Sequence, residues 1–454
     1  MILERVISKV VSHISYFIGS DNEAVVIDPR RDCHIYVELA KREGMNIKFI
    51  FETHRNEDYV IGSQELSHIT GAKIYHGSEL DFRYGNSLND GQEFFFGKLK
   101  ITSLHTPGHT LESTSYVLTD LDSGDCPVMV FTGDTLFVND VGRTDFGGPE
   151  KAREWSEQLY NSVFNKLLPL GDHVILCPAH GAGSVCGEGI ASREYSTIGI
   201  ERLMNPILQK TRNDFIDYLI TSEHYYAPYF RTMEKLNLEG APFVGYRSGP
   251  EALSADQFLQ QIEKGAIVVD VRSPVAFGGG HIKNSYSIPL RRLGFVGWVV
   301  QYDKPVLLVL QDQTQLEYVD KSLVRLGYDN VSGYLDGGFS SWYNASLPVD
   351  DLSLLTAKDL KEKLDNGEEL TLLDVRSKKE WINGHIKKAI HIYLGVLEKH
   401  LRDVPEDKPI IVVCKTGTRA SLASSILKRV GRREVYNLLG GMDSWRKADY
   451  SVTK

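Results

Sequence analysis

The sequence predicts a multidomain chain of α/β and α+β class, in which a two-sheet αββα sandwich precedes two small parallel α/β domains. Two observations support this fold class. Residues 1–245 alternate short apolar strands with loops that carry His or Asp, and residues 251–454 contain an internal repeat of about one hundred residues. The length of 454 residues is enough for roughly three domains of about 150 residues each.

The composition is that of a folded globular protein, with 42% hydrophobic and 24% charged residues. A formal net charge of -9 argues against a nucleic acid as partner, because phosphate binding depends on clustered Lys and Arg. The five cysteines are odd in number and scattered, which predicts reduced thiols in the cytoplasm. We expect no signal peptide and no membrane span, since the charge-free apolar runs stay below the roughly 18 residues that a span needs.

In the first region, apolar strands end at side chains that can bind a metal. Three runs read as buried strands: Ala24–Asp28, Ile47–Phe51 and Val128–Phe131. His54 follows the second run, Asp134 follows the third, and His180 follows another apolar run at 174–176. Ligands at the ends of strands are what a two-sheet sandwich needs to build a site along one edge.

The second region follows a Gly- and Pro-containing linker, expected over Leu236–Pro250, and contains two copies of one domain. The motif Asp270–Arg272 recurs as Asp374–Arg376, and His281 recurs as His385; 374 minus 270 and 385 minus 281 both give 104. A constant offset indicates a duplicated domain, because the repeats of a solenoid are shorter. The predicted domains are residues 1–245, 251–348 and 351–454.

A reactive cysteine is predicted in the second copy. The buried strand Pro409–Val413 leads directly into Cys414, and a helix is expected to start near Ala420. A Cys in this place lies among unpaired backbone N–H groups at the positive end of a helix, which favours a nucleophilic thiolate. The alternative is a small buried Cys at a strand end. The predicted anion-binding loop contains Lys415, Thr416, Gly417, Thr418 and Arg419.

The second copy resembles the rhodaneses on its Cys-x-x-Gly-x-Arg loop, together with Asp374–Arg376 and Gly384–Ile386. Four residues separate Cys414 from Arg419, whereas the similar Cdc25-type phosphatases have five. The resemblance implies that Cys414 carries sulfane sulfur as a persulfide, stabilised by the loop amides. In the first copy Leu310 occupies the position of Cys414, so we expect a structural or docking domain, or a domain that retains only a ligand pocket.

The segment Thr53–Tyr59 departs from a two-metal site. A dinuclear hydrolase would need His at positions 54, 56 and 59, but Asn56 is a poor zinc ligand and Tyr59 an unlikely one. His54, His109 and Asp134 remain, and two His with one carboxylate are the ligand set of a non-haem Fe(II) oxygenase.

These motifs are similar, in their order, to those of the metallo-β-lactamase superfamily over about residues 1–240. Within that superfamily the resemblance is to persulfide dioxygenases, which implies one Fe(II) held by His54, His109 and Asp134. It also implies that Arg143 helps to bind the thiol substrate. By the same resemblance, three residues would orient the ligands and bound water: Asn56, Asp58 and His180. Cys186 is interpreted either as a thiol facing the site or as a buried structural residue.

The two resemblances together imply a cytoplasmic persulfide dioxygenase joined to a thiosulfate sulfurtransferase, which would act in sulfide detoxification. The substrate would be a persulfide of glutathione, coenzyme A or bacillithiol, oxidised by O2 to sulfite and the thiol. Cys414 would move sulfur between thiosulfate, sulfite and the thiol. We expect a homo-oligomer. Two alternatives stay open: a zinc-dependent glyoxalase II-like thioester hydrolase, and a sulfurtransferase whose first domain binds persulfides without oxidising them.

Overall fold

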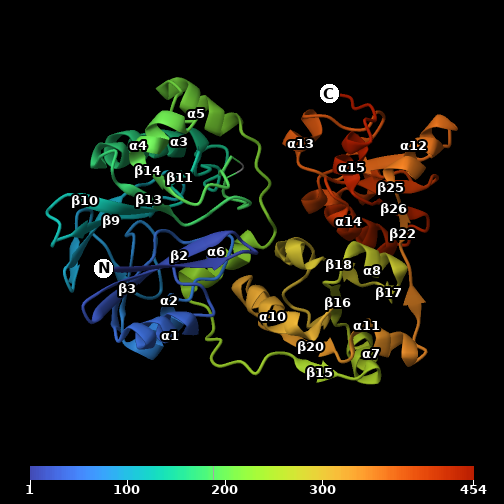
Figure 1. Ribbon diagram of the computed structural model, residues 1–454, viewed down its shortest axis with the longest axis horizontal. Helices are drawn as coiled ribbons and strands as arrows, with labels where there is room; N and C mark the ends of the chain where they lie inside the picture. The colour runs from blue at the N-terminus through green and yellow to red at the C-terminus, as the bar shows by residue number, and fades with distance from the viewer. Residues whose placement is uncertain (188) are drawn as a thin grey trace. The chain divides into compact units, whose positions relative to one another are not determined.

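The computed structural model describes residues 1–187 and 189–454, which form two compact units (Figure 1). The first unit contains Met1–Arg247 and Val324–Gly327, and the second contains Ser248–Leu323 and Tyr328–Lys454. The predicted end of the first domain at residue 245 lies beside this division. Within the described ranges, none of the helices has the length and hydropathy required to cross a lipid bilayer.

The first unit contains two sheets. One has the strand order β1-β2-β3-β4-β5-β6 and the other β14-β13-β10-β9-β8-β7. The first sheet contains β1 (Ile2–Ser8), β2 (His13–Ser20), β3 (Glu23–Ile27), β4 (Asn46–Phe51), β5 (Lys73–His76) and β6 (Asn86–Ser87). The second contains β7 (Glu93–Phe96), β8 (Leu99–His105), β9 (Thr114–Asp120), β10 (Pro127–Gly133), β13 (Ile175–Pro178) and β14 (Ser196–Thr197). A hairpin of β11 (Leu136–Phe137) and β12 (Asp140–Val141) follows β10.

The alternation of side chains along each strand builds the layers of this unit. Tyr16 and Ile18 of β2 pack with Phe131 of β10 in the core between the sheets, while Phe17 points to the opposite face. There it packs with Tyr36 of helix α1. The outer helices are α1 (His34–Glu43) and α2 (Ser63–Thr70) on the first sheet, and α3 (Ala152–Asn161), α4 (Ile198–Met204) and α5 (Arg212–Thr221) on the second. The predicted αββα sandwich is confirmed.

The start of the predicted linker is wrong. Helix α6 (Phe230–Glu239) includes Leu236, and it ends only at Gly240, where the backbone has a φ of 99°. The helix extends this far because Met233 and Asn237 are buried, and the side chain of Asn237 accepts a hydrogen bond from the amide of Ile61 at 2.9 Å. Tertiary contacts therefore override the Gly- and Pro-containing pattern up to Glu239.

The second unit contains two parallel sheets with the same topology. Their strand orders are β15-β20-β19-β16-β18 and β22-β26-β25-β23-β24. The first contains β15 (Glu251–Leu253), β16 (Ile267–Asp270), β18 (Tyr286–Ser287), β19 (Val306–Val309) and β20 (Val331–Leu335). The second contains β22 (Ser353–Leu355), β23 (Thr371–Asp374), β24 (Ile390–His391), β25 (Ile410–Val413) and β26 (Val435–Leu438). The matching orders confirm the predicted duplication.

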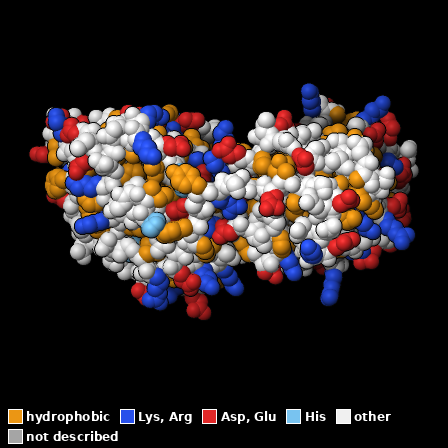
Figure 2. All heavy atoms as spheres, turned by 90° about the horizontal axis from the view of Figure 1, so that it is seen from below, with side chains coloured by type: hydrophobic (Ala, Val, Ile, Leu, Met, Phe, Trp, Pro, Cys, Tyr) orange, Lys and Arg blue, Asp and Glu red, His pale blue; other side chains and the backbone are white. Residues whose placement is uncertain are grey.

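Helices cover both of these sheets. In the first copy they are α7 (Ala255–Glu263), α8 (Pro274–Gly279), α9 (Val296–Val299), α10 (Leu316–Arg325) and α11 (Gly338–Asn344). In the second copy they are α12 (Ala357–Asp365), α13 (Lys378–Ile382), α14 (Thr418–Arg429) and α15 (Gly441–Lys447). A short ladder of β17 (His281–Ile282) and β21 (Val349–Asp350) completes the first copy. On the face shown in Figure 2, acidic and basic side chains are interspersed.

The repeated Asp-Val-Arg motif forms a buried ion pair between its Asp and its Arg in both copies. The Nη2 atom of Arg272 lies 2.6 Å from Oδ2 of Asp270, and the same atoms of Arg376 and Asp374 are also 2.6 Å apart. Each arginine also donates to the carbonyl of the glycine in the Gly-His-Ile motif, Gly280 or Gly384. Because these ion pairs are buried, removing one partner would leave an uncompensated charge.

Replacement of Phe131 by Ala tests the sandwich core. Phe131 is fully buried between the sheets, so truncation should lower the stability of the first unit by about 3–5 kcal/mol. Phe95, at the other side of the same sheet, is 52% exposed, and Phe95→Ala should change stability by less than about 0.5 kcal/mol. Calorimetric melting of both variants checks this, and equal melting temperatures would contradict the assignment of the core.

Candidate metal centre and cysteine loop

In the first unit, three side chains that follow strands bring together polar atoms that have no hydrogen-bond partner among the described residues. His54 follows β4, His109 follows β8 and Asp134 follows β10. Oδ2 of Asp134 lies 3.7 Å from Nε2 of His54 and 3.5 Å from Nε2 of His109. All three side chains are buried, and within the described chain these three atoms have no hydrogen-bond partner. Buried polar atoms of this kind are costly unless an ion binds them, so the set fits a divalent cation.

Hydrogen bonds fix both imidazoles in the tautomer that a metal needs. The hydroxyl of Thr53 donates to Asp28 at 2.7 Å, so it can only accept from Nδ1 of His54, which lies 2.9 Å away. Nδ1 of His109 donates to the carbonyl of Arg143 at 2.9 Å. Each ring therefore presents the lone pair of Nε2 to the site. Burial also lowers the pKa of His54 to about 4, which keeps this ligand neutral.

His180 lies between two carboxylates. Its Nδ1 donates to Oδ1 of Asp134 at 2.7 Å, and its Nε2 is within ion-pair distance of Asp58, 3.1 Å from Oδ2. Burial would lower the pKa of His180, but Asp134 and Asp58 outweigh it and raise that pKa well above its ordinary value. The charged imidazole ring therefore bridges the carboxylates of Asp134 and Asp58. His180 contacts the predicted ligand Asp134 directly and Asp58 contacts His180, while their orienting role stays a prediction.

Asn56 shapes the ligand loop through its backbone. Its φ is 49°, in the left-handed region that Asn tolerates better than most residues. Its side-chain amide donates to the carbonyl of His54 at 2.9 Å, and its own carbonyl accepts from Asn237 at 2.7 Å. The neighbouring Tyr59 stacks on the buried ring of His13, with a centroid separation of 3.9 Å. These contacts hold the loop of residues 54–59 against the sandwich.

Glu57 is a residue of the site that the sequence analysis missed. It is fully buried, and its Oε2 lies 3.7 Å from Nε2 of His109. Ligand atoms of His54, Glu57 and His109 all lie within 4.8 Å of one another. The only signal in the sequence is an acidic residue between the predicted ligand His54 and Asp58 in the same loop.

The predicted substrate residue Arg143 is tightly bound by neighbouring groups. Its guanidinium is 2% exposed and donates to both carboxylate oxygens of Asp145 at 2.6 Å. It also lies 4.8 Å above the ring of Phe146. Burial would raise the pKa of Asp145, but the hydrogen bonds and charge of Arg143 outweigh it and lower that pKa. The structure thus shows Arg143 orienting His109 through its carbonyl, while its role toward substrate stays a prediction.

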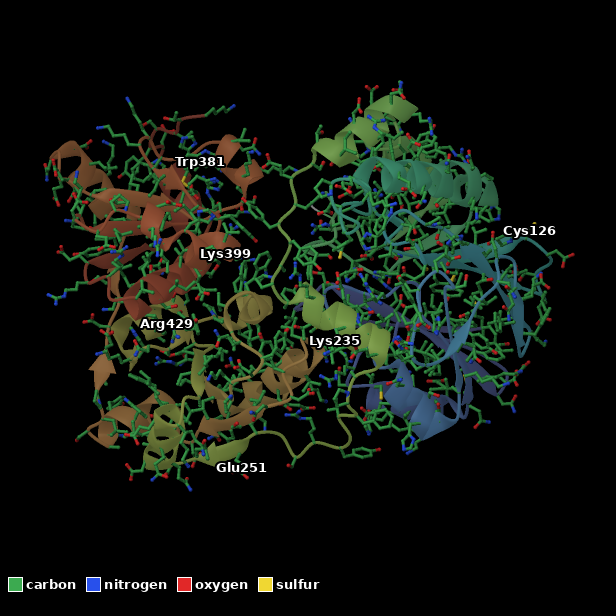
Figure 3. The ribbon with its side chains drawn as sticks, turned by 180° about the vertical axis from the view of Figure 1, so that it is seen from behind. Cys126, Lys235, Glu251, Trp381, Lys399 and Arg429 are labelled. Carbon is green, nitrogen blue, oxygen red and sulfur yellow. The ribbon has the colours of Figure 1, made fainter. Side chains whose placement is uncertain are left out.

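Cys186 faces the same site. Its sulfur lies within 4.8 Å of ligand atoms of His109 and Asp134, and also of Asp58 and His180. Burial raises the pKa of this thiol well above its ordinary value. His180 also lines a cavity of about 260 Å³, together with Arg5 and Arg193. Cys126, by contrast, is exposed in the turn before β10 (Figure 3).

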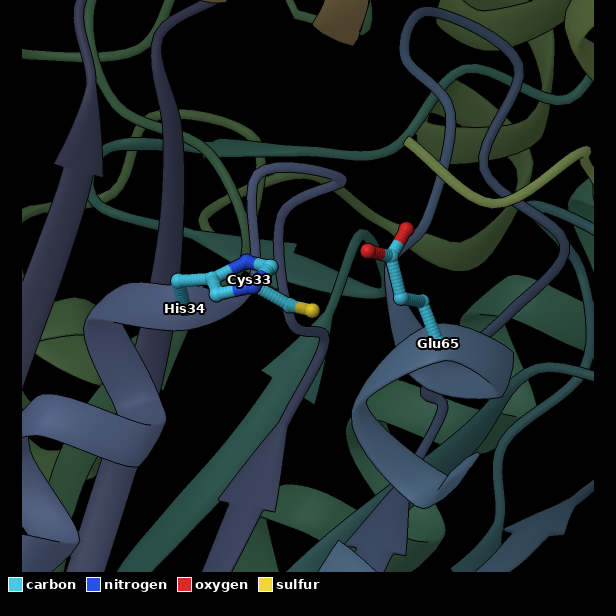
Figure 4. Close-up of side chains that lie close together, drawn as sticks. All are labelled: Cys33, His34 and Glu65. Atoms are coloured by element: carbon cyan, nitrogen blue, oxygen red, sulfur yellow. The ribbon is translucent and has the colours of Figure 1, made fainter. Parts of the chain in front are cut away.

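Cys33, His34 and Glu65 form another cluster of ligand-type side chains (Figure 4). The carboxylate of Glu65 is already satisfied, because it accepts from the amides of Val244 and Gly245 at 2.6 and 2.7 Å. Burial raises the pKa of Cys33 to about 12, which disfavours the thiolate that a metal requires. This cluster anchors the segment after α6 and is a poorer ion site than the one around Asp134.

In the second unit, the predicted loop wraps around Cys414. Strand β25 ends at Val413, Cys414 is buried, and α14 begins at Thr418. The amide of Gly417 donates to the sulfur of Cys414 at 3.0 Å. Gly417 has a φ of 88°, and a Cβ there would come within 3.1 Å of the carbonyl of Leu438, so the turn requires glycine. The structure thus supplies the amide contact that the sequence predicted for a sulfur anion.

Arg419 is held by a residue that the sequence analysis missed. Its two terminal nitrogens donate to the carboxylate of Glu380 at 2.6 and 2.7 Å. Burial would raise the pKa of Glu380, but the bond to Arg419 lowers it to about 2. Glu380 is also the third residue of α13 and caps that helix with Ser377. The pair positions Arg419 and offsets its charge beside the loop.

The first copy contributes a cation to the cysteine loop. Nε of Arg292 lies 3.5 Å from the hydroxyl of Thr418, and its charge interacts with both Arg419 and Cys414. Burial, and then Arg419, lower the pKa of Arg292. The hydroxyls of Ser287 and Ser421 are 2.7 Å apart, which joins the first copy to α14. The copy that lacks a cysteine therefore both covers helix α14 and adds charge beside the thiol.

Comparison with known proteins agrees with this architecture. The family described as "Metallo-beta-lactamase superfamily" matches residues 9–180, and "Rhodanese-like domain" matches residues 254–345 and 356–448. The chain is 29% identical over 236 residues to "Persulfide dioxygenase ETHE1, mitochondrial" of Bos taurus, covering 49% of this chain and 77% of that protein. It is 28% identical over 210 residues to "Hydroxyacylglutathione hydrolase GloC" of Haemophilus influenzae, covering 41% and 88%.

A solved structure extends the likeness to most of the chain. It is described as a metallo-beta-lactamase from Staphylococcus aureus subsp. aureus COL. It is 29% identical with a TM-score of 0.66, and covers 74% of this chain and 98% of that one. The likeness therefore extends beyond the sandwich, which ends near Arg247, into the second unit.

Thr53→Val tests the hydrogen-bond chain behind His54. The variant keeps the shape of the side chain but removes the only acceptor shown for Nδ1 of His54. Loss of such an orienting partner typically weakens metal affinity by about 10–100-fold. Thr53→Ser keeps the hydroxyl and should bind like the parent. Anaerobic titration against a chelator measures both, and equal affinities in the two variants would contradict this role.

Arg292→Ala tests the contribution of the first copy to the cysteine loop. Removing this cation should weaken the binding of a small anion such as thiosulfate beside Cys414 about tenfold, the effect of losing roughly 1.4 kcal/mol of charge-assisted binding. Arg291 is the adjacent exposed arginine, and Arg291→Ala is the matched control. Titration of each variant with thiosulfate measures the Kd. A Kd equal in both variants would show that Arg292 has only a structural role.

Proposed function

Because this chain consists of a metallo-β-lactamase superfamily domain followed by two rhodanese-like domains, we propose that it is an enzyme of sulfur metabolism with two activities. The first oxidises a low-molecular-weight thiol persulfide with O2 to sulfite and the thiol. The second transfers sulfane sulfur through Cys414. The observation that carries the first activity is the convergence of Nε2 of His54, Nε2 of His109 and Oδ2 of Asp134.

The residues of the first unit would prepare a site for one ion. Two neutral imidazoles and one carboxylate suit Fe(II), which would supply neighbouring open positions for O2 and for the persulfide sulfur. His180 holds Asp134 by one oxygen and leaves the other free for the ion. The stacked rings of His13 and Tyr59 close the inner side of the loop and keep bulk water out.

The cavity beside His180 suits a small acidic thiol. Its volume of about 260 Å³ falls near the lower end of ordinary ligand pockets. Arg5, Lys9 and Arg193 outnumber Glu194 in its lining, although Arg5 is paired with Glu194 and Arg193 with Glu201. The remaining positive charge would attract the carboxylates of glutathione or the phosphates of coenzyme A. His180 lines this cavity and donates to Asp134, so a thiol bound there would lie beside the candidate metal centre.

The cysteine loop supports a two-step transfer. The thiolate of Cys414 attacks the outer sulfur of thiosulfate, a new S–S bond forms, and sulfite leaves with the electron pair of the bond that breaks. A thiolate acceptor then attacks the outer sulfur of the Cys414 persulfide and leaves with it, which restores the thiolate of Cys414. The amide of Gly417 stabilises the charge on sulfur, and Arg292 and Lys415 attract the incoming anion.

The two activities would share intermediates. Sulfite and thiol are products of the oxidation, and they are also the leaving group and the acceptor of the sulfur transfer. A thiol persulfide made at Cys414 is in turn a substrate for the oxidation. This shared chemistry supports a role in removing excess sulfide.

Measurement of metal and oxygen together tests this proposal. Protein purified without oxygen should contain one iron per chain, take up O2 when glutathione persulfide is added, and release sulfite. Thioester hydrolysis restored by zinc alone would favour the hydrolase, to which the likeness to the Haemophilus influenzae enzyme also points. Protein with neither iron nor oxygen uptake, but with sulfur transfer, would contradict the oxidation and leave a sulfurtransferase.

Single substitutions should separate the activities. Cys414→Ser should abolish sulfur transfer from thiosulfate and leave oxygen uptake within about twofold, since serine forms no persulfide. His109→Ala should do the opposite. Cys126→Ser, at an exposed cysteine, is the control and should change neither. Loss of both activities in either active-site variant would contradict two separate sites.

A further inference from the structure

Glu57 places a second carboxylate against the predicted ligands. Its Oε2 lies 3.7 Å from Nε2 of His109, about as far as Oδ2 of Asp134, which is 3.5 Å from the same nitrogen. Both oxygens are buried, and neither has a hydrogen-bond partner within the described residues. We propose that Glu57 is a fourth protein ligand, so that two histidines and two carboxylates hold the ion. The inference rests on the metal site of the proposed function.

The geometry of His109 shows why an ion would fit there. Nδ1 of His109 donates to the carbonyl of Arg143, so Nε2 is the ring atom that faces Glu57 and Asp134. Nε2 and the two carboxylate oxygens are buried without a hydrogen-bond partner among the described residues, which is unfavourable unless a cation compensates them. The 3.7 Å between Nε2 and Oε2 of Glu57 is longer than a hydrogen bond.

The distances also suit coordination. Neighbouring ligand atoms bound at roughly 2.1 Å from one ion lie about 3.0 to 3.4 Å from each other, close to the 3.5 and 3.7 Å that separate Nε2 of His109 from Asp134 and Glu57. Ligand atoms of His54, Glu57 and His109 form one such group, within 4.8 Å of one another.

Neighbouring contacts hold Glu57 in this direction. Its other oxygen, Oε1, accepts from Nη2 of Arg55 at 3.2 Å, and Arg55 is itself held by Glu234 at 3.3 Å. The left-handed turn at Asn56 comes directly before Glu57 and redirects the chain. The segment that lost histidines at positions 56 and 59 has therefore acquired a different ligand at position 57.

A fourth ligand changes the chemistry of the site. Two carboxylates balance the charge of a divalent ion, whereas one leaves a net charge of +1. In an octahedral ion two positions remain instead of three, which is enough for O2 and one sulfur. Oxygen-rich sites also favour iron or manganese over softer metals. We therefore expect this site to bind its ion more tightly than a three-ligand site, and to attract anions less because its net charge is lower.

The test measures metal binding rather than turnover. Apoprotein is titrated anaerobically with Fe(II) and with Mn(II) against a chelator, and water relaxation counts the exchangeable waters on bound Mn(II). The parent should hold two waters, and Glu57→Ala should hold three. Glu57→Ala and the isosteric Glu57→Gln should bind at least about tenfold more weakly, since even an orienting partner is worth about 10–100-fold.

Glu112→Gln is the matched control. It removes another buried carboxylate from the same region, one that accepts from Arg55 and Thr110 and belongs to none of the ligand groups found among the described residues. Its metal affinity should stay within about threefold of the parent, and its water count should stay at two. A fall in metal affinity equal to that of Glu57→Gln would show a general charge effect and overturn the assignment of Glu57 as a ligand.

The outcomes separate this inference from the proposed function. Parent protein that binds no ion would overturn both. Parent protein that binds one ion with three waters, or Glu57 variants with unchanged affinity and water count, would overturn only the fourth ligand. The water count of the parent needs no variant, so the inference stays testable even where a Glu57 substitution fails to fold.

Discussion

The organisation of the first unit depends on the cost of burying lone pairs that face one another. Nε2 of His54, Nε2 of His109 and Oδ2 of Asp134 converge without hydrogen-bond partners. The surrounding structure enforces this arrangement through the bond from Thr53 to Asp28, the carbonyl of Arg143 and the bond from His180 to Asp134. In each side chain one nitrogen or oxygen atom is hydrogen-bonded to the protein, and the other atom is left for an ion. A sandwich that stabilised itself alone would have paired these atoms with one another.

The same constraint extends to His180. Its Nδ1 donates to Oδ1 of Asp134 and its Nε2 lies 3.1 Å from Oδ2 of Asp58, so the ring bridges two buried carboxylates. Asn56 and Tyr59 stand where a dinuclear pattern would have histidine, and their contacts are those of a turn and of a stacked core ring. These contacts and the bridge of His180 belong to one buried arrangement beside Asp134.

The second unit shows how a duplicated domain divides its tasks. Both copies keep the buried pair of Asp and Arg that ties strand β16 or β23 to the loop of the Gly-His-Ile motif. This pair belongs to the fold and says nothing about reactivity. Chemistry depends on the loop after β25, where Gly417 turns its amide to the sulfur of Cys414. The first copy has no thiol, but Arg292 brings a charge to that loop and Ser287 contacts α14.

Local pattern alone was sufficient for the sheets, the duplication and the cysteine loop. Strands and their following His, Asp or Cys residues are adjacent in sequence, and the sandwich brings the ends of β4, β8 and β10 together although β4 lies in the other sheet. The sequence therefore determined that His54, His109 and Asp134 form one candidate site and that Cys414 stands at a helix start. It also directed attention to Asn56 as the unusual position. Only the tertiary structure decided that the neighbouring Glu57 faces the ligands, that Glu380 holds Arg419, and that Arg292 reaches a loop more than one hundred residues away. Such contacts depend on side-chain direction and long-range packing, which no spacing along the chain encodes.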